Sequence, residues 1–292
     1  MAWPIVQIKL GEENYPKLLV QVADPPKKLY CRGNLDLLNT QCIGVVGTRK
    51  LTSYGKESAQ YITRGLVTAG FTIVSGLAMG IDAVAHQTTL DVGGKTVAVL
   101  GGGLNDQDIG PRVNFALAQN ILKSGGLLIS EYPDSSKVVK ANFAIRNRIV
   151  SGLSKGVVIV EADRDSGSLI TAQCALDQNR DVFAVPGSIF STRSSGSNEL
   201  IKKGAKLVAS AGDITEEYGY NLNIFEDKAN ISTQNTTQKN ILDILVNKGE
   251  TTTDEIVSSL PAFDTSDILS SLSMLEINGL VKKLSNGKYR KA

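Results

Sequence analysis

The residues best suited to hold a ligand stand in three glycine-rich turns, which follow the β-branched runs at residues 43–46, 72–75 and 96–100. Glycine lets a backbone approach a ligand closely, and the start of a following helix offers free N–H groups to an anion. A single turn of this kind is better explained by tight packing. Three together favour a phosphate-binding pocket, with the candidate residues Gly47, Thr48, Arg49, Ser75, Gly76, Gly80, Gly101 and Gly103.

A basic stretch with an aromatic residue inside it is the second feature. Between residues 134 and 155, five basic residues stand against one acid, and Phe143 lies among them. Cations that hold phosphates, together with a ring that stacks on a base, are typical of proteins that bind single-stranded nucleic acid. A solvated helix face with one buried ring would give the same pattern, so it is the glycine turns that favour nucleic acid. The basic residues are Lys137, Lys140, Arg146, Arg148 and Lys155.

Candidate catalytic groups are few. Glu161 follows the run 157–160 and precedes a Ser-rich and Asp-rich segment, where a carboxylate and hydroxyls could act on a sugar, as in a phosphoribohydrolase. A structural role is the stronger interpretation: Ser166 or Ser168 caps a helix, and Glu161 pairs with one of the two arginines of the basic stretch. His86, the single histidine, stands beside Ala85 and is interpreted as a hydrogen-bonded structural residue. We therefore predict no catalytic residues and a protein that is not an enzyme.

The composition of the chain limits its domain organisation and the kinds of partner it can bind. The chain has 292 residues, 42% of them hydrophobic, with 31 Lys and Arg against 29 Asp and Glu. This predicts a large and a small globular domain and excludes binding through bulk charge, though not through a local patch. No apolar run approaches the roughly 18 residues of a membrane span, and no secretory signal is visible. Three widely spaced cysteines and one histidine predict reduced thiols, a cytoplasmic location and no metal site, and neither G-x-G-x-x-G nor a P-loop is present to hold a cofactor.

The elements that must position these residues are short apolar runs that alternate with helical patterns. The runs are continuous rather than alternating in polarity, as strands covered on both faces require. Segments long enough for a crossover helix separate them. This predicts an α/β fold with a doubly wound parallel sheet over residues 43–220, in which the three turns meet at the carboxyl ends of the strands. The six predicted strands are 43–46, 72–75, 96–100, 127–129, 157–160 and 182–185.

The segments on either side of this sheet have other patterns. Residues 1–42, with several prolines, predict an irregular lead-in packed on the α/β domain, and the polar residues 221–237 predict a linker. Residues 238–292 show three helical patterns and then a hairpin with an Asn-Gly turn, which predict a small winged-helix domain. Its third helix, residues 264–278, carries three acids and no Lys or Arg. Phosphate would repel this helix, so we expect a protein contact or support of a dimer rather than a transcription factor.

Taken together, these motifs resemble the DNA-processing protein A family, also called DprA or Smf. The block from Phe143 through Arg146-Asn147-Arg148, followed by residues 166–172, is highly specific, and the resemblance covers roughly residues 15–210 in order. The other matching stretches are 46–49, 75–82 with 85–86, 130–133, 142–154, 160–162, 185–187 and 196–201 with 204–205.

The resemblance implies an extended Rossmann fold, a homodimer, binding of single-stranded DNA and loading of the RecA recombinase during natural transformation. By position in the motifs, Arg49, Lys140 and Phe143 match the family's DNA-pocket residues. Arg146 and Arg148 either contact DNA or brace the pocket through Glu161. We also expect Arg112 to hold a phosphate. The predicted DNA-binding residues are thus Gly47, Thr48, Arg49, Ser75, Gly76, Gly80, Gly101, Gly103, Arg112, Lys140, Phe143, Arg146 and Arg148.

The chain departs from related patterns at two places. Residues 110–114 read Gly-Pro-Arg-Val-Asn where the family usually has Tyr-Pro before its Arg/Asn element. Residues 186–190 read Pro-Gly-Ser-Ile-Phe at the place where nucleotide-hydrolysing relatives of the fold carry Pro-Gly-Gly-x-Gly-Thr. A phosphoribohydrolase-like enzyme that processes nucleotides is the alternative function, and this second departure disfavours it.

Overall fold

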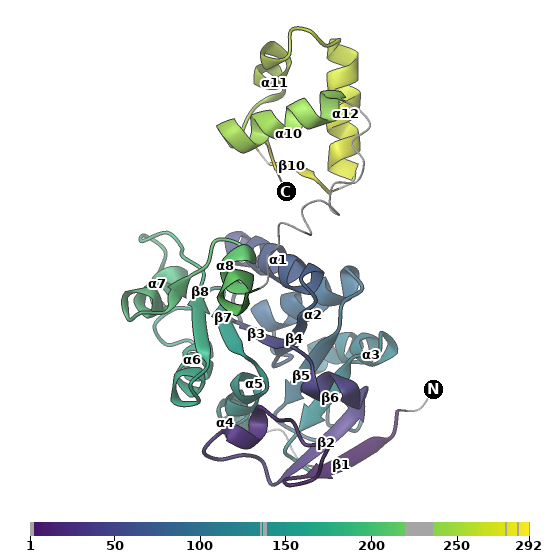
Figure 1. Ribbon diagram of the computed structural model, residues 1–292, viewed down its shortest axis with the longest axis vertical. Coiled ribbons are helices and arrows are strands. Elements are labelled where there is room, and N and C mark those ends of the chain that lie inside the picture. The colour runs from purple at the N-terminus through teal and green to yellow at the C-terminus, as the bar shows by residue number, and fades with distance from the viewer. Residues whose placement is uncertain are drawn as a thin grey trace. The chain divides into compact units, whose positions relative to one another are not determined.

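The computed structural model describes residues 3–134, 136, 139–219, 236–277, 279–284 and 286–291. The chain divides into two compact units, Met1–Leu222 and Asn223–Ala292, which Figure 1 draws from purple to green and from green to yellow. Each unit has its own apolar core. The predicted linker, residues 221–237, lies largely outside the described residues.

A nine-stranded sheet forms the centre of the first unit, in the order β1-β2-β6-β5-β4-β3-β7-β8-β9 (Figure 1). The seven strands from β3 to β9 are parallel. All six predicted strands are present to within one residue at each end, and β3, β4 and β5 are buried along their whole length, which confirms the doubly wound α/β prediction. The strands are β1 (Ile5–Lys9), β2 (Lys28–Gly33), β3 (Cys42–Val46), β4 (Thr72–Ser75), β5 (Thr96–Leu100), β6 (Leu127–Ser130), β7 (Gly156–Ile159), β8 (Asp181–Ala184) and β9 (Lys206–Leu207).

The lead-in is more regular than the sequence predicts. Its two strands extend the sheet: β2 pairs antiparallel with β6, and β1 pairs antiparallel with β2. Pro16, Pro25 and Pro26, which suggest irregular structure, fall in the connection between β1 and β2 and leave the strands free to pair. That connection contains η1 (Leu19–Gln21), and η2 (Leu35–Asn39) leads on to β3. Leu19 and Leu29 are fully buried in the core, so the lead-in belongs to the same unit.

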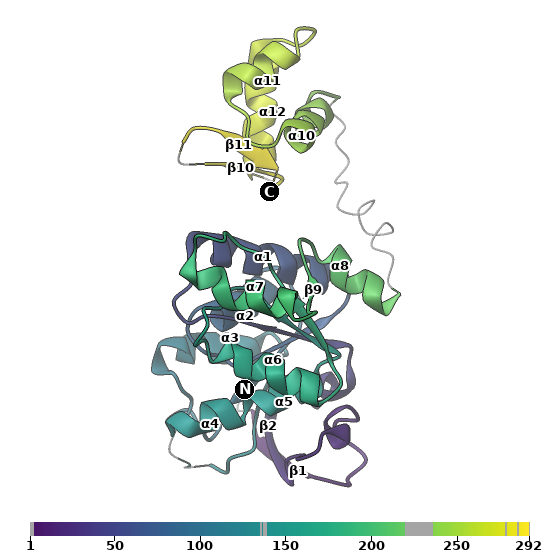
Figure 2. The same ribbon diagram turned by 90° about the vertical axis from the view of Figure 1, so that its left-hand side faces the viewer.

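Helices cover both faces of the sheet (Figure 2). Because successive strand residues point to opposite faces, Val45 packs with α1 and α2, whereas Val46 packs with α5 and α6. The helices are α1 (Ser53–Thr68), α2 (Ile81–Asp91), α3 (Phe115–Lys123), α4 (Lys140–Ile145), α5 (Asn147–Leu153), α6 (Ser168–Asp177), α7 (Ser195–Lys202) and α8 (Gly212–Thr215), with single turns at η3 (Arg112–Asn114), η4 (Thr192–Ser194) and η5 (Glu216–Tyr218).

The second unit consists of three helices and a hairpin. These are α10 (Thr236–Lys248), α11 (Thr253–Ser259), α12 (Thr265–Ile277) and the antiparallel strands β10 (Val281–Lys283) and β11 (Tyr289–Lys291). Thr252 and Glu255 form a capping box at the start of α11, which is why this short helix begins there. The elements follow the predicted order, while the winged-helix assignment stays a prediction. Neither unit contains, among its described residues, a helix long and apolar enough to cross a membrane.

Candidate nucleic-acid interface

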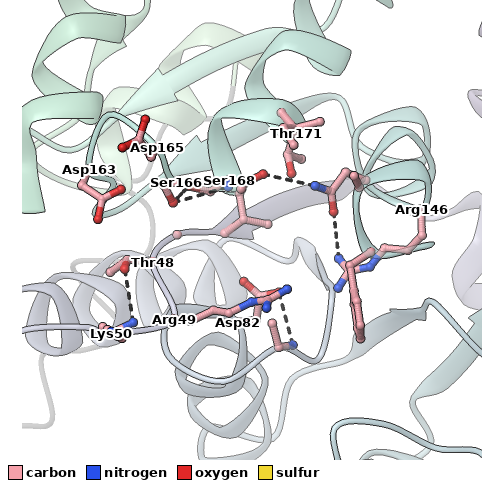
Figure 3. A pocket seen from close by; sticks show the side chains of 18 of the residues that line it. Thr48, Arg49, Lys50, Asp82, Arg146, Asp163, Asp165, Ser166, Ser168 and Thr171 are labelled. Carbon is pink, nitrogen blue, oxygen red and sulfur yellow. Dashed lines mark hydrogen bonds between the residues drawn. The ribbon is translucent and has the colours of Figure 1, made fainter. Parts of the chain in front are cut away.

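A pocket of about 470 Å³ opens where β3 and β7 lie side by side. From β3 the chain passes through α1 to β4, which lies next to β3 in the sheet. From β7 it passes through α6 to β8, which lies next to β7 in the opposite direction along the sheet. In open α/β sheets, ligands bind at such a switch point. Figure 3 shows Arg49, Asp82 and Arg146 on one side of the pocket and Ser166 and Ser168 on the other.

Arg49 and Phe143 form the part of the pocket best suited to a nucleotide. The guanidinium carbon of Arg49 lies 5.3 Å from the centre of the Phe143 ring, and both residues line the pocket. A cation over an aromatic face is a favourable contact, and the two groups together offer a nucleotide a charge for its phosphate and a surface for its base. Lys140 opens α4 one turn before Phe143, but its side chain lies outside the described residues.

Arg146 lies in the floor of the pocket with only 3% of its surface exposed. Its Nη2 donates to the Gly76 carbonyl at 2.6 Å and its Nη1 to Asn147 Oδ1 at 3.2 Å. Burial holds the pKa of Arg146 below its ordinary value, against the opposing charge of Asp82. A Cβ atom on Gly76 would fall within 1.6 Å of Nη1, so the guanidinium fits only against glycine. Arg146 therefore braces the second glycine turn from inside the pocket.

Asp82 is the acid that accompanies this buried cation. Burial raises its pKa, while Arg146 and the N–H groups of Ala78 and Gly76 lower it. The Gly76 N–H donates to Asp82 Oδ2 at 3.1 Å. The charge of Arg146 is thus opposed inside the protein, and the exposed Arg49 is the more available of these two arginines.

Arg148 and Glu161 do not take the positions that the sequence predicts. Arg148 lies outside the pocket and joins Glu131 at 2.7 Å and Asp24 at 3.3 Å, which ties α5 to the lead-in. The Glu161 carboxylate instead accepts hydrogen bonds from the Thr52 N–H at 2.9 Å and from its hydroxyl at 2.7 Å. The predicted pairing of Glu161 with Arg146 or Arg148 is therefore wrong, because the start of α1 satisfies this carboxylate.

The glycine turns mainly allow the backbone to pack closely. The N–H of Thr48 donates to the Glu161 carbonyl at 2.7 Å, and that of Gly103 to the Ser136 carbonyl at 3.5 Å. Together with the amide of Gly76, these groups already have acceptors, which differs from the predicted role as phosphate donors. Gly80 has φ +84°, and a Cβ there would lie 2.2 Å from the Thr48 carbonyl oxygen. The first and second turns thus meet through a contact that only glycine permits.

The remaining predicted residues lie behind or away from the pocket. The Ser75 hydroxyl donates to the Val45 carbonyl at 2.7 Å. Asn142 donates to the Gly101 carbonyl at 3.0 Å, so α4 covers the third turn. Arg112 is exposed, with its guanidinium 4.5 Å from the Phe115 ring, and does not line the pocket. Around this pocket the structure brings together Gly47, Thr48, Arg49, Phe143 and Arg146.

Several pocket residues are not among the predicted binding residues. The hydroxyls of Ser166 and Ser168 lie 2.8 Å apart at the start of α6, and the Ser166 hydroxyl also accepts from the Ser168 N–H at 3.4 Å. Arg193 of η4 lines the pocket and lies 3.5 Å from Asp163. The Ser-Gly-Ser motif could have pointed to the first group, whereas nothing in the local sequence points to Arg193.

His86 is a structural residue, as the sequence predicts. Its Nδ1 lies 2.7 Å from the Thr96 hydroxyl, which itself donates to the Ile73 carbonyl at 2.7 Å. Nδ1 therefore carries the proton and donates to Thr96. Burial lowers the pKa of His86 to about 3 and keeps the ring neutral. Among the described residues no group of three or more His, Cys, Asp or Glu could hold a metal ion.

Comparison with known proteins decides the family. The family model of DNA recombination-mediator protein A matches residues 7–219. The chain belongs to this family. Protein Smf of Escherichia coli K12 is 40% identical over 288 residues, which cover 97% of this chain and 76% of that protein. DNA processing protein DprA of Bacillus subtilis is 45% identical over 211 residues, which cover 72% of this chain and 70% of that protein.

Two solved structures of family members extend the comparison. The X-ray structure of DprA from Streptococcus pneumoniae superposes with a TM-score of 0.69 at 41% identity, over 73% of this chain and 74% of that one. DprA from Helicobacter pylori, whose structure is described for its single-stranded DNA binding mode, gives 0.67 at 33% identity, over 76% of this chain and 100% of that one. The resemblance to DprA and Smf proteins and the Rossmann-like fold are both confirmed.

Proposed function

We propose that this protein binds single-stranded DNA in the pocket between β3 and β7. One observation carries the proposal: the Arg49 guanidinium and the Phe143 ring, 5.3 Å apart, share one pocket at the switch point of the sheet. The single-stranded DNA binding described for the Helicobacter pylori relative supports it. On family membership we further propose that the protein acts in the cytoplasm as a homodimer and loads RecA onto the bound strand during transformation.

The size of the pocket favours a single strand over a duplex. A volume of about 470 Å³ accommodates a base with its sugar. In a duplex the bases are stacked and paired, so reaching such a pocket would require extruding a base at a cost of a few kcal/mol. A ring and a cation recognise any base by its face and any nucleotide by its phosphate, so we expect binding with little sequence preference.

No catalytic step forms part of this proposal. The enzymatic alternative depends on Glu161 as a free carboxylate, but Thr52 donates to both of its oxygens. His86 is fully buried and bonded to Thr96. Incubation with a panel of nucleotides should therefore release no free base, and release of base would return the enzymatic function to consideration.

The direct test is fluorescence anisotropy with a labelled oligonucleotide, single-stranded and duplex, over a series of salt concentrations. For single strands, log K falls against log salt by about 0.7 for each phosphate neutralised. Arg49→Ala should weaken binding and make this slope shallower by about 0.7, because one phosphate contact is lost. Arg64→Ala, which removes an exposed arginine of α1 that does not line the pocket, is the matched control. Equal affinity for duplex, or an unchanged slope in Arg49→Ala, would count against the proposal.

A further inference from the structure

The loop between β8 and η4 contains a tight turn that exposes two large apolar side chains. The Ser191 N–H donates to the Ser188 carbonyl at 3.0 Å, and the Phe190 N–H donates to the Ser188 hydroxyl at 3.2 Å. Ile189 and Phe190 are the two central residues of this turn. They are 84% and 91% exposed, more than any other large apolar side chain in the described part of the chain.

Hydrogen bonds hold the base of this turn in place. The Gly187 N–H donates to Asn198 Oδ1 at 3.1 Å, and Asn198 Nδ2 donates back to the Gly187 carbonyl at 3.0 Å, which fixes the loop to α7. The Tyr54 hydroxyl donates to the Pro186 carbonyl, which fixes it to α1. Turns of this kind usually carry Gly, Asn, Asp, Ser or Pro at their centre. An Ile-Phe pair in a fixed turn contributes little to folding, so its exposure points to a ligand.

The turn adjoins the nucleotide pocket in sequence and in structure. Arg193 follows Phe190 by three residues, a span of at most about 11 Å, and lines the pocket. Tyr54, which is 49% exposed, lies in the first turn of α1, shortly after the pocket residues Arg49 and Lys50. The pocket thus supplies cations beside its Phe143 ring, and the turn adds the Phe190 ring three residues from one of them, Arg193. Cations combined with more than one aromatic ring are what proteins use to hold a single strand along several nucleotides.

We propose that Phe190, with Ile189 beside it, is a second stacking platform that holds the base next to the one in the pocket. The inference rests on the proposed single-strand function and extends the site from one nucleotide to two. Contact with a second copy of this chain is the competing use of the turn. Two side chains supply far less than the roughly 800 Å² per partner of a standard protein interface. Arg193 and Lys50 of the adjoining pocket suit a phosphate chain better than a protein surface.

The test compares Phe190→Ala with wild type in the full chain. Short oligothymidylate should bind Phe190→Ala about fivefold or more weakly, because one base loses its stacking partner. The same oligonucleotide with abasic sites should bind both proteins equally, and thymidine monophosphate should compete equally at the pocket of both. Leu176→Ala, which truncates a 54% exposed residue on α6, is the control and should bind as wild type does. Phe190→Trp should retain affinity, and its added fluorescence should be quenched by the intact but not by the abasic strand.

The outcomes separate the two proposals. If Arg49→Ala weakens binding and Phe190→Ala does not, the platform is overturned and the pocket stands. If wild type shows no preference for single strands and Arg49→Ala has no effect, the proposed function itself fails. Sedimentation of each variant completes the test: a loss of affinity in Phe190→Ala that accompanies a fall in oligomer mass would assign the turn to contact between copies and overturn the platform.

Discussion

Arg146 and Asp82 show how the pocket keeps charge in its floor without presenting it to a ligand. A buried ion survives only when hydrogen bonds and an opposite charge replace its lost hydration. Here the Gly76 carbonyl and Asn147 accept from the guanidinium, and Asp82 holds the N–H of Gly76. The pair thereby fixes the turn after β4 against α5. Arg49, which carries no comparable internal pairing in the described structure beyond Phe143, is the residue whose charge a phosphate can use.

A prediction for a single residue concerns His86. In the unfolded chain its pKa is about 6.5, whereas burial lowers it to about 3 in the folded protein. Between these values only the unfolded chain takes up the proton, so stability falls as pH falls, by about 1.4 kcal/mol per pH unit and about 2 kcal/mol by pH 5. His86→Asn keeps a donor for the Thr96 hydroxyl and removes the titrating group. Urea unfolding of this variant should show a smaller loss between about pH 7.5 and about pH 5, and parallel losses would contradict the assignment.

Residue type predicted some of the site and packing decided the rest. Arg49 and Phe143 could be named because an arginine in a glycine turn and a ring among cations are informative by themselves. The partners of Arg148 and Glu161 could not, because Glu131, Asp24 and Thr52 meet them only through the folded sheet. Arg193 stands in an irregular loop, where no periodicity shows which way a side chain will point.

At the scale of elements, the start of α1 gives a second prediction. Glycine to alanine usually stabilises a helix by up to about 1 kcal/mol. A Cβ at Gly55, however, would lie 2.2 Å from Glu161 Oε2 and displace the carboxylate that accepts two hydrogen bonds from Thr52. Gly55→Ala should therefore lower the free energy of unfolding by about 2 kcal/mol, since bonds to a charged group are worth this much. Gly167→Ala, with no atom within 4 Å of its Cβ, is the control in urea unfolding. A Gly55→Ala protein more stable than wild type would contradict this role of Glu161.

A strand could be predicted where its own residues form a clear apolar pattern, and not where its position depends on distant partners. The central strands are continuous apolar runs, because helices cover both faces, and the sequence alone identified all six. The lead-in strands have mixed burial: β1 is the edge of the sheet, and β2 lies between β1 and β6. The pairing of β2 with β6 joins Tyr30 to Ser130, a register that only the assembled sheet defines. The two-residue strand β9 is too short to leave a periodic signal.

At the scale of the whole molecule, the pocket is a consequence of strand order. Among the parallel strands β3 comes first in the sequence, β4, β5 and β6 extend the sheet on one side of it, and β7 lies on its other side. The crossovers after β3 and β7 therefore leave the sheet toward opposite faces, and Arg49 and Ser166, which stand between each strand and its helix, line the pocket from opposite sides (Figure 3). In open α/β sheets the switch point is where a ligand crevice forms, and the residues lining it decide what enters.

DNA binding should reside in the first unit alone. Each has its own core, the second built around Ile241, Leu245 and Leu272, so each should fold separately. All of the proposed DNA contacts lie in the first unit, whereas α12 carries Asp267 and Glu276 and no basic residue, which would repel phosphate. A chain ending at Leu222 should therefore keep the affinity and the single-strand preference of the full protein, and residues 223–292 should not bind duplex at about 0.15 M salt. Anisotropy with both oligonucleotides measures this. Duplex binding by the second unit would show that the attraction of its hairpin lysines for phosphate exceeds the repulsion by the acidic helix, and would assign a DNA-binding role to that unit.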